Sequence, residues 1–426
     1  MYNLKDFNLE LKSTLSKPLY YFFCAYSLFI VIQYVTNYPF IPALIFYAAV
    51  VPSILFCGYK NGFLSRIISL EYWKIQPIER KLLLFLFIYV FINSLFLSAG
   101  IKGFKKNITN DISLFLFIAC SLVYFSLPKK YLEVFFSVLT VTGLIFAMAS
   151  IAVFLADGSE SRLLPIGRAH HQILGASVYG FIGIISLYLF YIANGENIFI
   201  TAKKIFYIMT ILVIFIMILL TGSRGPMLSY IICIATGIFI YARSPLKTKL
   251  YYIFLSIAVL GSIAYFITIS EHSYIHSYFK SLIDRGSAQR LDLWKLTLSE
   301  IKLQPFFGYG LNARLNHIYY APHNIFLGSA YYLGLTGMVL FLSLTIITFI
   351  KSCRITRCKH ELSSVHGVKY SKFILLLLMH AYLSGFFDNS QLIKGVSPLW
   401  IIFWLPVAMA ISNLKPSLAP VQVGAT

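Results

Sequence analysis

Four polar segments interrupt an otherwise apolar sequence, and they contain the side chains best suited to chemistry. The segments are 167–171, 221–226, 270–323 and 388–394. They hold arginines and histidines, whereas the acidic residues of the long segment are scattered and do not form a ligand set for a divalent metal. This inventory suits a reaction in which guanidinium groups neutralise a diphosphate and an imidazole handles a proton. We therefore expect neither a metal nor another cofactor.

Arg224 lies in a tight turn directly before an apolar run. Gly222 and Gly225 allow a ligand to approach the backbone closely, and Pro226 is typical of the first turn of a helix. Backbone N–H groups at a helix start, together with a guanidinium, would form an anion site. The alternative is an interfacial arginine that extends to the lipid headgroups.

Residues 288–301 have the pattern of a helix with one apolar face. Four apolar residues recur at steps of three and four: Leu291, Trp294, Leu298 and Ile301. Ser287 is placed to cap the start of this helix, and Pro305 ends it. Arg290 lies on the apolar side, where burying a guanidinium is costly without an anionic partner. We expect Arg290 to bind an anionic ligand group; the alternative is an arginine paired within the protein or extending to headgroups.

His323 lies between Pro322 and Asn324, where the long segment meets the next apolar run. Imidazole exchanges a proton readily near neutral pH, so His323 is the candidate general base. A histidine that is hydrogen-bonded to backbone at a helix start is the alternative.

Five further residues are candidates for substrate binding because they lie in or beside the same polar segments. They are Arg168, His171, Trp294, Asn324 and Asp388. The sequence does not decide which of His170, His171 and His323 titrates during a reaction.

The composition places these segments at a membrane surface. The chain is 59% hydrophobic and only 12% charged, whereas soluble domains carry about 25% charged residues. Its 38 Phe and 30 Tyr suit lipid-facing and interfacial positions. The net charge of +20 is explained by Lys and Arg in cytoplasmic loops, so we expect no nucleic-acid partner.

A spanning helix needs roughly 20 mainly apolar residues, and twelve segments of the sequence qualify. They are 19–36, 39–57, 81–99, 110–127, 133–155, 172–193, 204–221, 225–242, 249–269, 324–350, 371–388 and 396–412. These spans predict an all-α polytopic membrane protein in which 1–426 form one integral membrane domain. The segment 270–323 is then a loop with short helices, inserted between the ninth and tenth spans.

The distribution of Lys and Arg predicts that both termini are cytoplasmic and that all four polar segments lie outside. Three lysines are exceptions to this rule: Lys102, Lys105 and Lys106. Three acidic residues are placed at span ends, and none in the middle of a span: Asp111, Glu133 and Asp388. The lack of ionisable groups at mid-membrane depth counts against an ion-coupled carrier.

At these residues the sequence resembles the O-antigen ligase and polymerase superfamily of bacterial envelope enzymes. The matching stretches are Arg290-x3-Trp294, the run 304–310, Pro322-His323-Asn324 and Gly334-x2-Gly337. The turn 221–225 resembles the family's upstream arginine turn. The resemblance covers about residues 172–350, and the number of spans extends it across the chain.

The resemblance implies a membrane glycosyltransferase with the GT-C-like helical fold of enzymes that use lipid-linked sugars. It implies transfer of a glycan from undecaprenyl diphosphate to an acceptor at the periplasmic face of the inner membrane, with inversion at the anomeric carbon. By the same resemblance, Arg224 and Arg290 would hold the diphosphate, and His323 would act as base on the acceptor hydroxyl. Asp388 falls where ligase relatives carry an acid between the last spans.

The superfamily has two branches. Ligases join O-antigen to lipid A-core, whereas polymerases join one lipid-linked repeat to another. Polymerases often carry a glycine eleven residues after a loop arginine, but Ile301 stands at that offset from Arg290. One dominant outer loop favours a ligase, with undecaprenyl-linked O-antigen, lipid A-core and membrane lipids as its partners. The alternative from another class is a non-enzymatic flippase or exporter of lipid-linked glycans, which would need a charged cavity at membrane depth.

Overall fold

Every element of the computed structural model is helical, which confirms the predicted all-α class for the part of the chain that it describes. The described residues are 16–60, 76–98, 100–157, 162–167, 171–195, 197–241, 290–315, 322–357, 365–388 and 393–413. The predicted span 249–269 and the first part of the long loop, up to residue 289, lie outside them.

The first half of the chain forms eight helices in these ranges, of which one short element is a π-helix. They are α1 (Lys17–Val35), α2 (Phe40–Ile45), η2 (Phe46–Val50), α3 (Val51–Lys60), α6 (Ile78–Phe96), α7 (Gly100–Tyr124), α8 (Lys129–Asp157) and α9 (Gln172–Ile192). The second half continues with α10 (Ile198–Leu220), α11 (Arg224–Tyr241), α14 (Arg290–Leu303), α15 (Ile325–Arg357), α16 (Val365–Asp388), η3 (Trp400–Trp404) and α17 (Leu405–Asn413).

Nine helical stretches of the described residues are long and apolar enough to cross a membrane, and each overlaps one of the predicted spans. The predicted span 81–99 corresponds to α6, which opens with three charged residues, Glu79, Arg80 and Lys81. The last predicted span corresponds to a shorter apolar helix, Trp400–Asn413. The protein is therefore a polytopic membrane protein.

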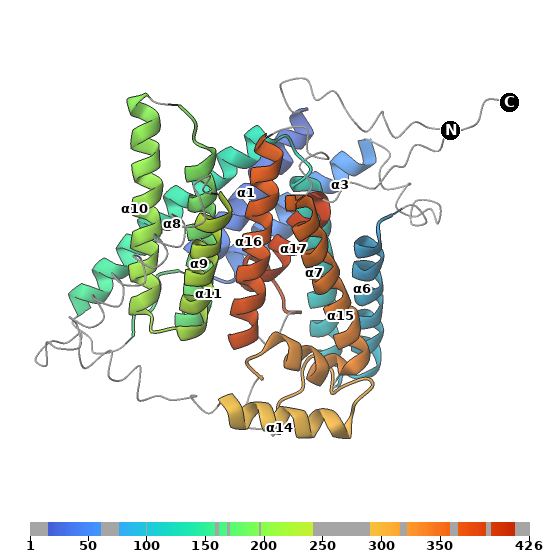
Figure 1. Ribbon diagram of the computed structural model, residues 1–426. Helices are drawn as coiled ribbons and strands as arrows, with labels where there is room; N and C mark the ends of the chain where they lie inside the picture. Colours follow the sequence, from blue (N-terminus) through green and yellow to red (C-terminus); the bar gives the residue numbers. More distant parts are fainter. Residues whose placement is uncertain are drawn as a thin grey trace, which may run out of the picture.

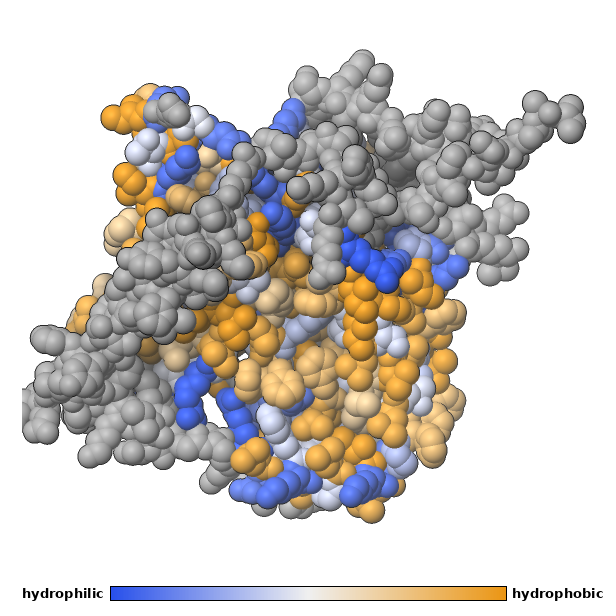
Figure 2. All heavy atoms as spheres, viewed as in Figure 1, coloured by the Kyte–Doolittle hydropathy of each residue, from blue (hydrophilic) through white to orange (hydrophobic). Residues whose placement is uncertain are grey.

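The helices form a bundle around α9, which packs against α8, α10, α11 and α16. Every residue of α9 from Gly175 to Leu189 is buried, as expected for a helix that is covered on all sides. Figure 1 shows α14 lying across one end of this bundle, hereafter the α14 end. In Figure 2 an apolar band crosses the middle of the visible face, and hydrophilic residues gather towards the two ends. This distribution is that of a protein with the bilayer as its solvent.

The start of α7 corrects one expectation. The helix begins at Gly100, ten residues before the predicted span, so Asp111 lies well inside α7 instead of at its end. The extra turns carry Lys102, Lys105 and Lys106, which are all exposed. A hydropathy threshold excludes such lysine-rich turns, although a helix can continue through them when its charged side chains reach water.

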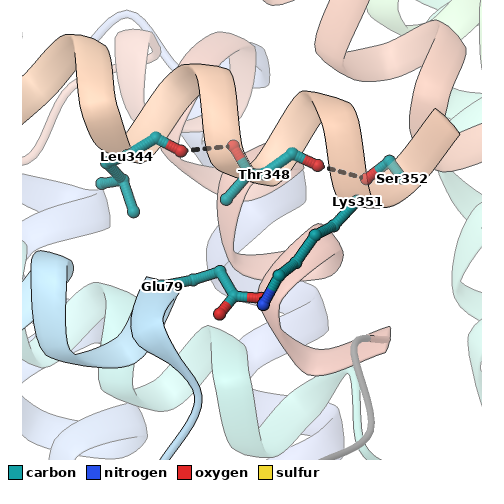
Figure 3. A network of polar contacts seen from close by, with 5 residues as sticks. All are labelled: Glu79, Leu344, Thr348, Lys351 and Ser352. Atoms are coloured by element: carbon teal, nitrogen blue, oxygen red, sulfur yellow. Dashed lines mark hydrogen bonds and ion pairs between the residues drawn. The ribbon is translucent and has the colours of Figure 1, made fainter. Parts of the chain in front are cut away.

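At the opposite end from α14, an ion pair joins α6 to α15 (Figure 3). Lys351 Nζ lies 2.5 Å from Glu79 Oε1, and the Glu79 side chain is fully buried. A buried carboxylate is tolerated only when it is paired, because desolvation of a lone charge costs several kcal/mol. Next to the pair, Thr348 and Ser352 donate to carbonyl oxygens of their own helix. The pair fixes α15 against α6. His323 lies just before the other end of α15, which begins at Ile325.

Candidate functional site

Three elements that carry candidate residues, from separate parts of the sequence, meet around Phe386 and Phe387 at the end of α16. The Trp294 ring of α14 meets Phe386 edge-on, with ring centroids 5.7 Å apart. Phe326, in the first turn of α15, lies 6.3 Å from the same ring. A Cβ atom added at Gly225 would lie 2.6 Å from Phe387 Cβ, so the start of α11 also packs here. The end of α16 thus brings the elements bearing Arg224, Arg290 and His323 together at the α14 end.

The turn before α11 is held by Arg162, a residue that the sequence did not single out. Arg162 Nε donates to the Thr221 carbonyl at 2.6 Å, and Nη2 donates to Ser223 Oγ at 3.1 Å. Both Thr221 and Ser223 are buried, and Gly222 has a positive φ of 61°. Arg224 itself is exposed at the first position of α11. Arg162 therefore holds the buried side of the turn, and Arg224 is exposed at its end.

The buried face of α14 differs from the expected one. Leu293, Thr297 and Ile301 are buried, whereas Leu291 and Leu298 are 56% and 49% exposed. In a membrane protein an apolar side chain can face lipid or protein equally well, so the pattern of leucines alone did not identify the packed side.

The placement of Arg290 on the buried side of α14 agrees with the geometry. Arg290 is half-buried at the first position of the helix and lies on the same side as Leu293 and Thr297. The predicted cap, Ser287, lies outside the described residues.

Trp294 has a hydrogen-bond donor that no described group accepts. Its ring is half-buried and packs against Phe386, and its indole Nε1 is buried without a hydrogen-bond partner. A buried indole N–H normally finds an acceptor. This unpaired donor lies one turn along the helix from Arg290.

His323 has an unusual backbone conformation. Its φ is 51°, and it is the one non-glycine residue with a positive φ among those that the structure describes. Such a conformation costs of order 1–3 kcal/mol and persists only where neighbours enforce it. Asn324 provides that restraint, because its Oδ1 accepts from the N–H groups of Phe326 at 2.9 Å and Leu327 at 3.0 Å. The buried Asn324 thus caps α15 and restrains the backbone directly after His323, whose side chain is exposed.

The turn after α14 docks onto a break in α15. The break is at Gly334, where φ is 69° and ψ is 179°. Tyr309 N donates to the Tyr331 carbonyl, Gly310 N to the Tyr332 carbonyl, and Leu335 N to the Pro305 carbonyl, at 2.7–2.9 Å. These bonds satisfy backbone groups that the interruption of α15 would otherwise leave unpaired. The docked turn fixes α14 relative to the helix that carries His323.

Replacing Gly334 by alanine is expected to destabilise the protein more than replacing Gly100 by alanine. Both glycines have a φ near 68°, which strains an alanine, and Gly334 also has a ψ of 179°, a combination that only glycine adopts readily. An alanine Cβ at Gly100 would meet nothing within 4 Å, whereas at Gly334 it would overlap the backbone of Phe306. Thermal unfolding of the two purified variants measures the difference. Equal unfolding temperatures would mean that the turn does not press on Gly334.

Tyr309 lies close to the candidate residues but is not suited to act as a base. Its hydroxyl donates to Glu300 Oε2 at 2.9 Å. Burial, and next the Glu300 carboxylate, raise the pKa of Tyr309 to about 12. The phenol therefore stays protonated at neutral pH and serves to fasten the turn to α14.

The remaining candidates are less well placed by the described geometry. His171 is exposed at the start of α9, and its carbonyl accepts from Gly175 N at 2.8 Å. Asp388 is the last residue of α16, directly after Phe387. Arg168 and His170 lie outside the described residues.

One histidine that the sequence did not suggest is structural. His380 is fully buried in α16, with Nε2 2.8 Å from the Ser177 carbonyl and Nδ1 2.8 Å from Ser229 Oγ. A carbonyl oxygen can only accept, so Nε2 carries the proton. The ring joins α9, α11 and α16, and it lies so close to Gly180 that an added Cβ would be 2.6 Å away.

The fold and the site are those of a helical membrane protein whose arginine- and histidine-bearing elements converge at one end of the bundle. Residues 209–342 match the model of the family described as O-antigen ligase. The O-antigen ligase of Pseudomonas aeruginosa is 22% identical over 276 residues, which cover 63% of this chain and 61% of the relative. The chain thus matches about three fifths of the relative's length. These matches confirm the resemblance to the O-antigen ligase superfamily.

Proposed function

We propose that this protein transfers O-antigen polysaccharide from undecaprenyl diphosphate to a sugar hydroxyl of lipid A-core. The observation that carries the proposal is the meeting of the Arg224 turn, the Arg290 helix and the His323 helix start around the end of α16. All three of these elements fall within the part matched by the O-antigen ligase family. The name of the relative, O-antigen ligase, supports O-antigen as the transferred glycan; the lipid-linked donor and the lipid A-core acceptor are part of the proposal.

The two arginines would bind the diphosphate of the donor. Guanidinium groups form paired hydrogen bonds to phosphate oxygens and stabilise the negative charge that grows on the leaving group. Trp294 supports this role, because its indole N–H has no hydrogen-bond partner and lies on the same helix as Arg290. It would donate a hydrogen bond to a phosphate oxygen of the lipid-linked glycan. No metal is needed to bind a diphosphate that two arginines neutralise, and no metal takes part in the proposed reaction.

His323 would accept the proton of the acceptor hydroxyl. That oxygen attacks the anomeric carbon while the bond from this carbon to the diphosphate oxygen breaks, so the configuration inverts. The exposed imidazole, held by the cap at Asn324, supports the assignment of His323 as the base. We assign Arg168, His171 and Asp388 to the binding of the glycan or acceptor, and Asn324 to the positioning of His323.

The proposed orientation places the α14 end in the periplasm and both termini in the cytoplasm of a bacterium, with the protein in the inner membrane. In this orientation the whole chain is one membrane domain, and 270–323 is its periplasmic loop. The pair Glu79–Lys351 then lies near the cytoplasmic surface.

Gel analysis of lipopolysaccharide from a deletion strain tests the proposed reaction. Loss of a ligase leaves bare core while lipid-linked polymer accumulates. Core that carries a single repeat would instead identify a polymerase. A normal ladder would contradict both enzymatic functions. Accumulation of lipid-linked glycan on the cytoplasmic face only would support the flippase alternative.

A further inference from the structure

A group of buried oxygen atoms lies on α6 and α7, two helices that carry none of the candidate residues. Three side chains form this oxygen cluster: Ser94, Asn107 and Asp111. Their exposed fractions are 1%, 1% and 3%. Ser94 Oγ, Asn107 Oδ1 and both carboxylate oxygens of Asp111 are buried without a hydrogen-bond partner. Buried polar atoms are nearly always paired, so four unpaired oxygens on two adjacent helices require an explanation.

The geometry brings the three side chains to one place. Asn107 and Asp111 are four residues apart on α7 and so share a face. Asn107 Nδ2 donates to Ser98 Oγ at 2.9 Å, and Ser98 lies one turn beyond Ser94 on the α6 side. The Ser94 hydroxyl faces the Asp111 carboxyl. The Asn107 amide nitrogen is thus occupied, which leaves its oxygen directed towards the cluster.

Among the described residues, no cationic side chain pairs with Asp111. Neither of its oxygens has a partner, and the lysines of the same helix, Lys102, Lys105 and Lys106, are exposed. An unpaired buried carboxylate is costly. With Asp111 ionised, the cluster would hold one negative charge and two neutral oxygen ligands. These are the ligands that hard cations prefer, and one carboxylate balances one positive charge.

We propose that Ser94, Asn107 and Asp111 bind a sodium ion. A divalent ion would leave an uncompensated positive charge among buried groups. The ion would also steady the candidate active site, because the adjacent Asn93 donates to the Phe307 carbonyl at 2.8 Å and Asn312 donates to the Gly103 carbonyl at 3.3 Å. The turn that carries α14 therefore rests on the ends of the two helices that hold the ion.

Thermal unfolding of the purified full-length chain in detergent tests the proposal. The wild-type protein is measured in NaCl, KCl and choline chloride at one ionic strength. We expect a saturable rise in Tm of about 2–5 °C with sodium. The rise should be lost in Asp111→Asn and retained in Asp157→Asn, a matched change at an exposed carboxylate on α8. Retention of radioactive sodium by the wild-type protein provides a direct measurement of binding.

Ser94→Ala keeps the proposal testable if Asp111→Asn does not fold. This variant removes one neutral ligand and should raise the half-saturating sodium concentration at least about tenfold. A wild-type Tm that is the same in sodium and choline, or a rise that persists in both variants, would overturn the proposal. The measurement uses no glycan substrate, so its result is independent of the transferase activity.

Discussion

Replacing His323 by glycine is expected to lower the rate constant of the proposed glycan transfer by about 10²–10⁴-fold, the usual contribution of a positioned general base. Glycine is the informative replacement because the backbone at this position has a φ of 51°. Glycine adopts this conformation without cost, whereas alanine would add backbone strain to the chemical defect. The measurement is single-turnover transfer from lipid-linked donor by purified protein.

Added imidazole should restore part of the activity of His323→Gly, because it can enter the space left by the side chain and accept the proton. His323→Gln is the second control, since glutamine keeps a hydrogen-bonding group but cannot take a proton at neutral pH. If the glutamine variant is fully active, or if imidazole has no effect while His323→Gly folds normally, His323 positions the acceptor and is not the base.

Arg290→Ala is expected to reduce the rate of transfer by about 10²–10³-fold. Removing one group that stabilises developing negative charge typically has an effect of this size. Lysine should not restore the rate, because its single charged group lacks the planar fork that binds two phosphate oxygens. Arg290 is half-buried against the bundle, so its charge acts in a medium of low dielectric constant. The same assay, run at saturating donor, separates the rate from donor binding.

Lys302→Ala is the matched control for Arg290, because it removes an exposed cation from the other end of the same helix. It should leave transfer unchanged. Full activity of Arg290→Lys would show that only a positive charge is needed. If Arg290→Ala loses transfer and also has a lowered Tm, Arg290 stabilises the fold and is not shown to bind the diphosphate.

The spans were predictable because their composition differs so strongly from that of a soluble chain. The start of α7 was not, since Lys102 and its neighbours lower the hydropathy of turns that are nevertheless helical. The packed face of α14 was also not predictable, because Leu291 and Leu298 are as compatible with lipid as Leu293 is with protein.

The candidate site was predictable in its residue types but not in its construction. The polar segments identified Arg224 and His323, yet no pattern pointed to Phe386, which is one phenylalanine among 38 in the chain. Arg162 lies in a short polar stretch without any motif, and only its bonds to the turn before α11 give it a role. Contacts between residues far apart in the sequence leave no periodic signal, so these features required the structure.

The position of Phe386 and Phe387 near the end of the sequence also bears on how the protein is made. The Arg224 turn and α14 are synthesised before the α16 residues against which they pack. At about 5–20 residues per second, Phe387 is synthesised on the order of ten seconds after Arg224. The nascent protein therefore spends this interval with most of its spans in place and its arginines unassembled. The order of synthesis therefore delays assembly of the candidate site until insertion of the membrane helices is nearly finished.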